Sequence, residues 1–421
     1  MLTGRRLSHH YGFYITVYQG GFEKSPFYSI FDNYGVPCMF STLTSKEHSL
    51  RKRMITNIYS KSYIQSSASA EAQSKVILFD RFLPILSQST TGPEASSGLD
   101  VFSFYLASTM DFISAYIFGI ASSSNFLQDK AVRDHVLALY RCRGENTFFR
   151  QELPGLNAFC KRLGIHLCPK RADQANRKLE AWNKSHCDKA IRHLESTKSD
   201  LTGTADEPIV LKAVLAGIEK EAKSHGKQSL LYPTALLHRD ISVASEVFDH
   251  ILAGQETAGL AMTYLTWHMS QDQALQGRLR EELLSIEPNL KLSDDGVQSL
   301  PDPKELDALR LLHAIMMETL RLNAPIGGPE PRRTPYPQCQ IGPYTVPGGA
   351  RIAALAHTLH RDEYVFPDSE KWDPNRWLSS EADEEERKLR NRQFWAFGSG
   401  GRMCIGSNFA VKGEDAILRL V

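Results

Sequence analysis

One cysteine near the end of the sequence lies in a glycine-rich stretch. Residues 397–406 read FGSGGRMCIG, and Cys404 directly precedes a segment that is predicted to be helical. A helix N-terminus stabilises a thiolate, and glycines let backbone N–H groups approach the sulfur of a metal-bound thiolate. Arg402 could bind an anionic group beside it. Taken alone, each feature also fits a glycine-rich phosphate loop or a plain turn around a buried cysteine.

Three further motifs lie upstream of this loop: AGQET at 253–257, ETLR at 318–321 and WDPNRW at 372–377. Glu318 and Arg321 are one helical turn apart, a spacing that usually gives a solvated pair worth a few tenths of a kcal/mol. Glu256 and Thr257 offer a carboxylate and a hydroxyl that could relay protons. A threonine inside a helix more commonly bonds its own backbone. No motif decides the function by itself.

Together the motifs resemble the signature sequences of the cytochrome P450 family, in the family's order and roughly at its spacing. The glycine-rich loop resembles the haem-binding signature, with Phe397, Gly400, Arg402 and Gly406 around Cys404. The resemblance implies that Cys404 is the axial ligand of haem b, iron protoporphyrin IX. A thiolate on haem iron donates electron density that favours O–O cleavage.

The resemblance also implies a structural role for the ETLR and WDPNRW motifs. Glu318, Arg321 and Arg376 are expected to form a Glu–Arg–Arg cluster that locks the fold and the haem-binding loop. Breaking a buried charge cluster of this kind is costly in stability. We therefore expect these three residues to stabilise the fold and not to contact the substrate.

On the other face of the haem, the family places a long helix with an oxygen-activating motif. The resemblance implies that Glu256 and Thr257 relay protons there. Ala253 and Gly254 are small, and we expect them to leave room for dioxygen, which would offset the helix penalty of the glycine.

Several basic residues match positions at which the family binds haem propionates. His48 and Lys52 are the first such pair, with Lys52 where arginine is more usual, so Arg53 is a second candidate. Arg332 or its neighbour Arg333 matches another propionate-binding arginine, and only one of the two is expected to serve.

The elements that must position these residues are mostly helices. Helices are predicted over the segments 45–60, 101–120, 171–196, 241–271, 272–286 and 304–322. The segment 45–60 is basic, and the segment 101–120 carries apolar residues on most faces, as a buried helix would. Two β-prone runs, 344–346 and 351–353, are separated by prolines and glycines and predict a hairpin. We expect the mainly α cytochrome P450 fold with small β-sheets, as a single domain over residues 1–421.

Composition and charge exclude several other classes of protein. The formal net charge is +1, from 49 Lys+Arg and 48 Asp+Glu, which disfavours nucleic-acid binding. Seven scattered cysteines with no CxxC pair argue against a disulfide framework or a structural zinc site. His268 and His360 are interpreted as core histidines with satisfied hydrogen bonds, not as metal ligands.

Both ends of the sequence are short relative to the family. The resemblance begins near Phe31, and Val421 falls within the helix after the cysteine loop, so the membrane anchor, the first elements and the C-terminal β-segments have no counterpart. We therefore expect a truncated chain or an incomplete gene model. Full-length relatives are expected in the endoplasmic reticulum membrane, whereas this chain shows no anchor.

The resemblance implies a haem-dependent monooxygenase that inserts one oxygen atom from O2 into an apolar small molecule. Segments 40–63 and 111–119 are most similar to fungal monooxygenases of secondary metabolism. No flavin or dinucleotide module is apparent, so the electrons should come from a separate NADPH–cytochrome P450 reductase. The alternatives are a non-catalytic haem-binding remnant and a haem-thiolate isomerase or dehydratase; the Glu256–Thr257 pair speaks against the latter.

Overall fold

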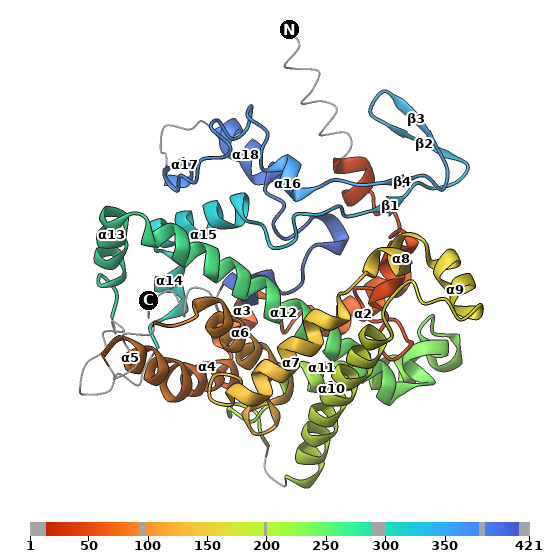
Figure 1. Ribbon diagram of the computed structural model, residues 1–421, viewed down its shortest axis with the longest axis horizontal. Helices are drawn as coiled ribbons and strands as arrows, with labels where there is room; N and C mark the ends of the chain where they lie inside the picture. Colours follow the sequence, from red (N-terminus) through yellow and green to blue (C-terminus); the bar gives the residue numbers. More distant parts are fainter. Residues whose placement is uncertain (1–13, 92–97, 198–199, 288–299, 379–383, 412–421) are drawn as a thin grey trace. The chain divides into compact units, whose positions relative to one another are not determined.

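The computed structural model describes residues 14–91, 98–197, 200–287, 300–378 and 384–411 (Figure 1). Within these ranges the chain is mostly helical and its strands are short. The predicted mainly α fold with small β-sheets is confirmed. The last helix is predicted from about residue 407 to residue 421. Residues 407–411 are helical, and residues 412–421 lie outside the described ranges.

The elements follow one another along the chain as single helices, short turns and two-residue or four-residue strands. The α-helices are α2 (Ser45–Ile55), α3 (Lys61–Ser66), α4 (Ala68–Lys75), α5 (Leu83–Thr91), α6 (Val101–Phe118), α7 (Lys130–Arg143), α8 (Thr147–Glu152), α9 (Pro154–Arg162), α10 (Lys170–Ser196), α11 (Ile209–His225), α12 (Arg239–Ser270), α13 (Gln273–Leu283), α14 (Pro303–Asp307), α15 (Arg310–Leu322), α16 (Ala356–Leu359), α17 (Asn375–Leu378) and α18 (Glu384–Gln393). The shorter 3-10 or π turns are η1 (Tyr14–Gln19), η2 (Pro26–Phe31), η3 (Val76–Phe82), η4 (Ile120–Ser122), η5 (Gly226–Gln228), η6 (Tyr232–Leu236) and η7 (Gly400–Arg402). The strands are β1 (Arg332–Arg333), β2 (Gln338–Ile341), β3 (Tyr344–Pro347) and β4 (Arg351–Ile352).

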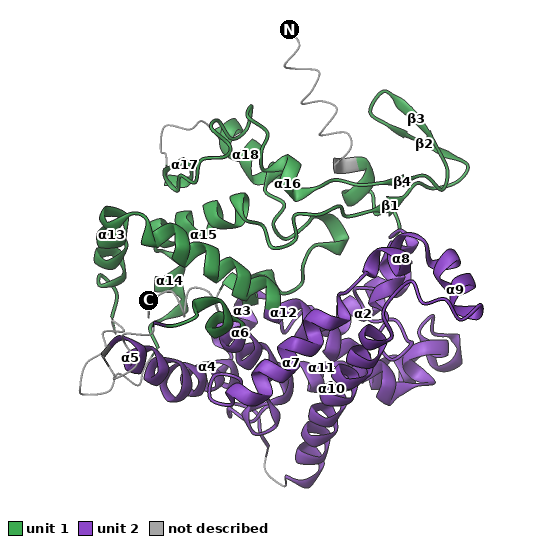
Figure 2. Ribbon diagram, in the orientation of Figure 1, with its two compact units in different colours: residues 1–23, 99–106, 256–421 green, residues 24–98, 107–255 purple. Residues whose placement is uncertain are grey.

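The chain forms two compact units, each made of more than one segment (Figure 2). Unit 1 comprises residues 1–23, 99–106 and 256–421, and unit 2 comprises residues 24–98 and 107–255. Helices α6 and α12 each begin in one unit and end in the other. The single domain over residues 1–421 stays a prediction.

The helical segment predicted over 304–322 is two helices. α14 ends at Asp307, and α15 begins at Arg310. The carboxylate of Glu282, from α13, accepts hydrogen bonds from the backbone N–H groups of Leu311 (2.8 Å) and Leu312 (2.9 Å). The first N–H groups of a helix have no partner within the helix. The Glu282 carboxylate, distant in the sequence, accepts two of them and so stabilises the N-terminus of α15.

The predicted hairpin of residues 344–346 with residues 351–353 is wrong. β3 pairs with β2 and β4 pairs with β1, both antiparallel. Gly342 has a φ of +56°, which permits the tight turn between β2 and β3. Between β3 and β4, Gly348 and Gly349 pack instead against Tyr336, whose Cα would lie 2.7 Å from a Cβ on Gly348.

The predicted buried helix over 101–120 is α6. Among the described residues it is the one helix that is long and apolar enough to cross a membrane, and 83% of its span is buried within the protein, as in a core helix. In unit 2, Ile113, Tyr116 and Phe118 of this helix are at most 3% exposed.

Two glycines of α12 permit close contact with α6. In unit 2, a Cβ on Gly254 would lie 2.7 Å from Cγ1 of Ile113. In unit 1, a Cβ on Gly259 would lie 3.2 Å from the backbone of Leu106. Gly254 therefore has a packing reason that the sequence did not reveal, in addition to the predicted role beside dioxygen.

We expect Gly254→Ala to destabilise the protein, because overpacking a core costs about 1–3 kcal/mol. This outweighs a helix-propensity gain of at most about 1 kcal/mol. Gly277, exposed on α13 with no atom within 4 Å of an added Cβ, is the matched control. Thermal unfolding should show a lower midpoint for Gly254→Ala and an unchanged or higher one for Gly277→Ala. Equal shifts for the two variants would contradict this account.

Candidate functional site

Glu318 and Arg321 form a buried ion pair on α15. Arg321 Nε donates to Oε2 of Glu318 at 2.9 Å, and Nη2 donates to Oε1 at 2.8 Å. Both side chains are completely buried. The two parallel bonds give the pair a fixed geometry, which a solvated surface pair lacks.

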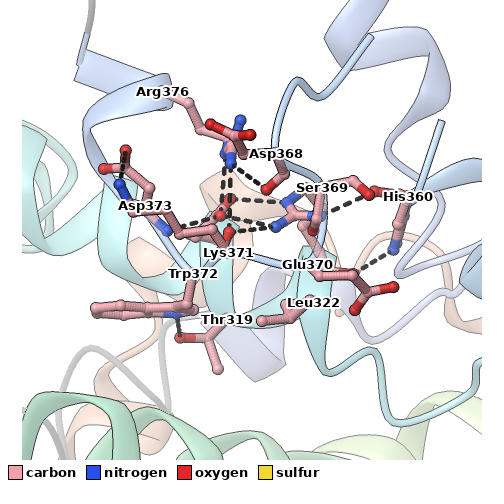
Figure 3. Close-up of polar contacts among 12 residues, drawn as sticks. Thr319, Leu322, His360, Asp368, Ser369, Glu370, Lys371, Trp372, Asp373 and Arg376 are labelled. Carbon is pink, nitrogen blue, oxygen red and sulfur yellow. Dashed lines mark hydrogen bonds and ion pairs between the residues drawn. The ribbon is translucent and has the colours of Figure 1, made fainter. Parts of the chain in front are cut away.

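The remaining donors of Arg321 bind backbone carbonyls of a single following segment. Nη1 donates to His360 O (2.8 Å) and Ser369 O (2.7 Å), and Nη2 donates to Lys371 O (3.1 Å) (Figure 3). All five N–H groups of the guanidinium thus have an acceptor. The irregular segment from residue 360 to residue 371 is consequently attached to α15 through one side chain.

Glu318 collects further donors from the WDPNRW motif. Its Oε1 accepts from the backbone N–H of Asp373 (2.9 Å) and from Nε of Arg376 (3.0 Å), and its Oε2 accepts from Nε1 of Trp377 (2.9 Å). In Figure 3, Asp373 lies at the left and His360 at the right of these polar contacts. The structure therefore brings together Glu318, Arg321 and Arg376, as the motifs imply.

His360 links this cluster to the start of the cysteine loop. The backbone N–H of Trp395 donates to its Nε2 at 2.7 Å, so Nδ1 must carry the proton that is donated to Arg321 O at 2.7 Å. The ring is completely buried, and burial lowers its pKa to about 4. It is a neutral core histidine with both nitrogens satisfied.

His268 is satisfied but only partly buried. Its Nε2 lies 2.8 Å from Oδ1 of Asn323, and its ring stacks on Trp372 with centroids 4.7 Å apart. Burial lowers its pKa, and its partial exposure sets it apart from the fully buried core histidine that the sequence predicts.

The cysteine loop is closed by its own backbone. Cys404 N–H donates to Phe397 O at 2.9 Å, and Met403 N–H donates to Gly400 O at 3.0 Å. The side chain of Cys404 is exposed, and a Cβ on Gly406 would lie 3.9 Å from its sulfur. The loop therefore presents one thiol at the surface of unit 1, beside a position without a side chain.

These residues fit a cofactor that takes a single thiolate from the protein. All seven cysteines lie in the part of the chain that the structure describes, and none forms a disulfide. Among those same described residues no group of three or more His, Cys, Asp or Glu side chains could hold a metal ion. A haem, whose porphyrin supplies the other iron ligands, is compatible with a single thiolate from the protein.

Tyr18 supports the cysteine loop, a role that the sequence did not reveal. Gly400 has a φ of +71°, and a Cβ at this position would lie 2.2 Å from Tyr18 O. Only glycine at position 400 therefore allows the loop to pack this closely against Tyr18. The Tyr18 hydroxyl donates to Glu330 O (2.8 Å) and accepts from Ala354 N–H (2.7 Å). Its ring packs edge-on against the ring of Trp395, with the ring centroids 4.5 Å apart.

The same tyrosine contacts one of the two candidate propionate arginines. The guanidinium carbon of Arg332 lies 4.8 Å from the centre of the Tyr18 ring, and its Nη2 lies 3.4 Å from Oε2 of Glu330. Arg332 is 2% exposed, whereas Arg333 is 44% exposed and lies 3.7 Å from Glu23. The structure thus holds Arg332 rigidly and leaves Arg333 open to solvent.

The other predicted site residues are divided between the units. Unit 1 contains Phe397, Gly400, Arg402, Cys404, Gly406, Arg332, Glu256 and Thr257, and unit 2 contains His48, Lys52, Arg53, Ala253 and Gly254. On α2, His48 is buried, Lys52 is partly exposed and Arg53 is exposed. On α12, Ala253 lies three and four residues before Glu256 and Thr257, so the three share one face of that helix.

Comparison with known proteins agrees with this geometry. A sequence model described as Cytochrome P450 matches residues 24–418. The cytochrome P450 monooxygenase avaI of Aspergillus versicolor is 28% identical over 394 residues, which cover 91% of this chain and 83% of that protein. The monooxygenase hkm5 of Aspergillus hancockii is 36% identical over 169 residues, 40% of this chain and 31% of that protein. Tabersonine 6,7-epoxidase isoform 2 of Catharanthus roseus is 30% identical over 172 residues, 41% of this chain and 31% of that protein.

We expect Arg321→Ala to yield insoluble protein or protein without haem. The substitution removes three carbonyl contacts and leaves the Glu318 carboxylate buried with one fewer cation, at a cost of about 3–5 kcal/mol. Arg171→Ala is the control, because its pair with Glu145 lies at the surface. Soluble yield and bound haem per chain measure the effect, and a normal haem content in Arg321→Ala would refute the structural role.

His360 should make stability depend on pH. Because its folded-state pKa of about 4 lies below the usual value near 6.5, the unfolded chain binds a proton in this window that the folded chain does not. The free energy of unfolding therefore falls as pH drops from 6.5 towards 4, by a total on the order of 3 kcal/mol. In urea denaturation, His360→Gln should show a flatter profile across this window. Parallel profiles for the two proteins would contradict the assignment.

Proposed function

Because the chain belongs to the cytochrome P450 family, we propose that it is a haem-thiolate monooxygenase that inserts one oxygen atom from O2 into an apolar small molecule. The observation that carries the proposal is the exposed Cys404 in a closed glycine loop, within the same unit as the Glu318–Arg321–Arg376 cluster. A buried cluster in which every donor of Arg321 has an acceptor makes a rigid support for a loop that must hold one sulfur in place.

The proposed cofactor is haem b, with Cys404 as its only ligand from the protein. A thiolate-ligated haem supplies the activation of dioxygen. Gly406 leaves space beside the sulfur, and Gly400 lets the loop approach Tyr18 closely. Arg402, Arg332, His48 and Lys52 are the residues proposed for the propionates. Arg332 is suited to this role because Glu330 and the Tyr18 ring already fix its guanidinium, so little side-chain entropy is lost on binding.

Protons are proposed to reach the reaction through α12. Glu256 is exposed on this helix, so its carboxyl group can exchange a proton with solvent. Thr257 follows it and carries a hydroxyl that can accept one proton and donate another. Ala253, on the same helical face, has too small a side chain to obstruct them.

The electron donor is proposed to be a separate NADPH–cytochrome P450 reductase. An apolar substrate is proposed because the loop before His48 and the segments 248–252 and 324–328, where the sequence leads us to expect pocket residues, contain mostly apolar or small residues and few charges. A role in fungal secondary metabolism is supported by the similarity to monooxygenases of Aspergillus species.

The proposal is tested by reduced carbon-monoxide difference spectra of the wild-type protein and of Cys404→Ser. We expect a thiolate-type Soret shift in the wild-type protein and its loss in the variant, because serine cannot supply a thiolate. Cys160→Ser, which alters a partly exposed cysteine on α9, is the control and should keep the shift. Absence of the shift from the wild-type protein would overturn the haem-thiolate assignment.

The monooxygenase step is tested separately, with the reductase, NADPH and labelled O2. Transfer of one labelled oxygen atom to an apolar substrate supports it. A normal Soret shift with no oxygen transfer over a broad substrate panel would favour a haem-binding remnant, and a product without labelled oxygen would favour an isomerase or dehydratase.

A further inference from the structure

A small cavity in unit 2 lies among three helices and contains unsatisfied polar groups. It has a volume of about 10 Å³ and lies between α2, α11 and α12. Its apolar wall includes Met54, Ile55, Val214 and Ile218. Its polar wall is formed by Arg51, Ser242 and Glu246. A volume of this size is about that needed by one water molecule.

Two polar atoms in this wall are buried and have no hydrogen-bond partner among the described residues. They are Nε of Arg51 and Oγ of Ser242, in side chains that are 5% and 1% exposed. The rest of the Arg51 guanidinium is engaged, since Nη1 lies 3.6 Å from Oε2 of Glu246 and Nη2 donates to Oγ1 of Thr234 at 3.0 Å. Buried polar groups without a partner are rare in native proteins and indicate a bound water or ion.

We propose that this cavity holds one ordered water molecule bridging Arg51 Nε, Ser242 Oγ and the Glu246 carboxylate. The water accepts a hydrogen bond from Arg51 Nε–H and donates one to the Glu246 carboxylate. Its third hydrogen bond is with the Ser242 hydroxyl, which can act as donor or acceptor. Three partners are typical of a buried water, and a cavity that stays dry is normally lined by apolar groups alone.

The charges of the site favour water over an ion. Arg51 and Glu246 have opposite charges, so the site carries no net charge to attract an anion or a cation. An anion would also lie against the Glu246 carboxylate, which is 5% exposed and therefore poorly screened.

The water would complete a connection between α2 and α12. Glu246 also accepts the backbone N–H of Met39 at 3.0 Å, so the same carboxylate attaches the segment that precedes α2. α2 carries His48 and Lys52, the proposed propionate residues, and a fixed α2 is what they require. This last consequence rests on the proposed function, whereas the water site does not.

Ser242→Ala distinguishes a hydrated site from a dry one. If the cavity is dry, removing an unsatisfied hydroxyl raises the melting temperature; if it holds water, the variant loses a hydrogen bond and the melting temperature falls. Ser185→Ala, an exposed position on α10, corrects for the helix propensity of alanine. We expect the haem-loaded Ser242→Ala protein to melt a few degrees below the Ser185→Ala protein. An equal or higher melting temperature would overturn the proposal.

A crystal structure of the full chain gives the direct test. We expect a solvent peak within hydrogen-bond distance of Arg51 Nε, Ser242 Oγ and Glu246. An empty cavity at a resolution that shows ordered waters elsewhere would refute the proposal. A bromide soak with an anomalous peak at this position would also refute it, because the site would then be an anion site.

Discussion

The carboxylate of Glu318 is the charge on which the organisation of unit 1 depends. It is completely removed from water, and a carboxylate in that position is tolerated only if cations and hydrogen-bond donors replace its hydration. Two arginines, one indole and one backbone N–H do so, and they come from α15, from α17 and from the residues directly before α17. Satisfying one carboxylate therefore fixes α15, α17 and the chain between them. Arg321 extends the constraint, because its carbonyl partners hold residues 360 to 371.

This constraint reaches the cysteine loop through a histidine and a tyrosine. His360 accepts the N–H of Trp395 and donates to Arg321 O, so the residue two positions before the loop is tied to the cluster. Trp395 in turn packs on Tyr18, whose carbonyl faces Gly400 and whose ring faces Arg332. None of these residues bears the chemistry attributed to Cys404. Their effect is to leave the loop few alternative positions, as a pre-organised metal ligand needs.

Unit 2 uses a buried carboxylate in a comparable way. Glu246 of α12 faces Arg51 of α2 and accepts the N–H of Met39, so a helix and the segment before it are joined to α12. The geometry is looser than at Glu318, since the nearest Arg51 nitrogen lies 3.6 Å from the Glu246 carboxylate. Two neighbouring polar atoms also have no hydrogen-bond partner in the part of the chain that the structure describes. A bridging water supplies what the protein side chains do not.

Local pattern was sufficient for most of the helices and for the family. Helical periodicity predicted α2, α6, α10, α12 and α13, because apolar spacing is a property of neighbouring residues. The spacing of the motifs around Glu318, Arg376 and Cys404 indicated the family, since a rare combination of residue types carries that information without any contact being known. The tertiary structure alone decided which strands pair, where α15 starts, why Gly254 faces Ile113, and that Tyr18 supports the cysteine loop. Each of these depends on contacts between residues far apart in the chain, for which a single sequence contains no local signal.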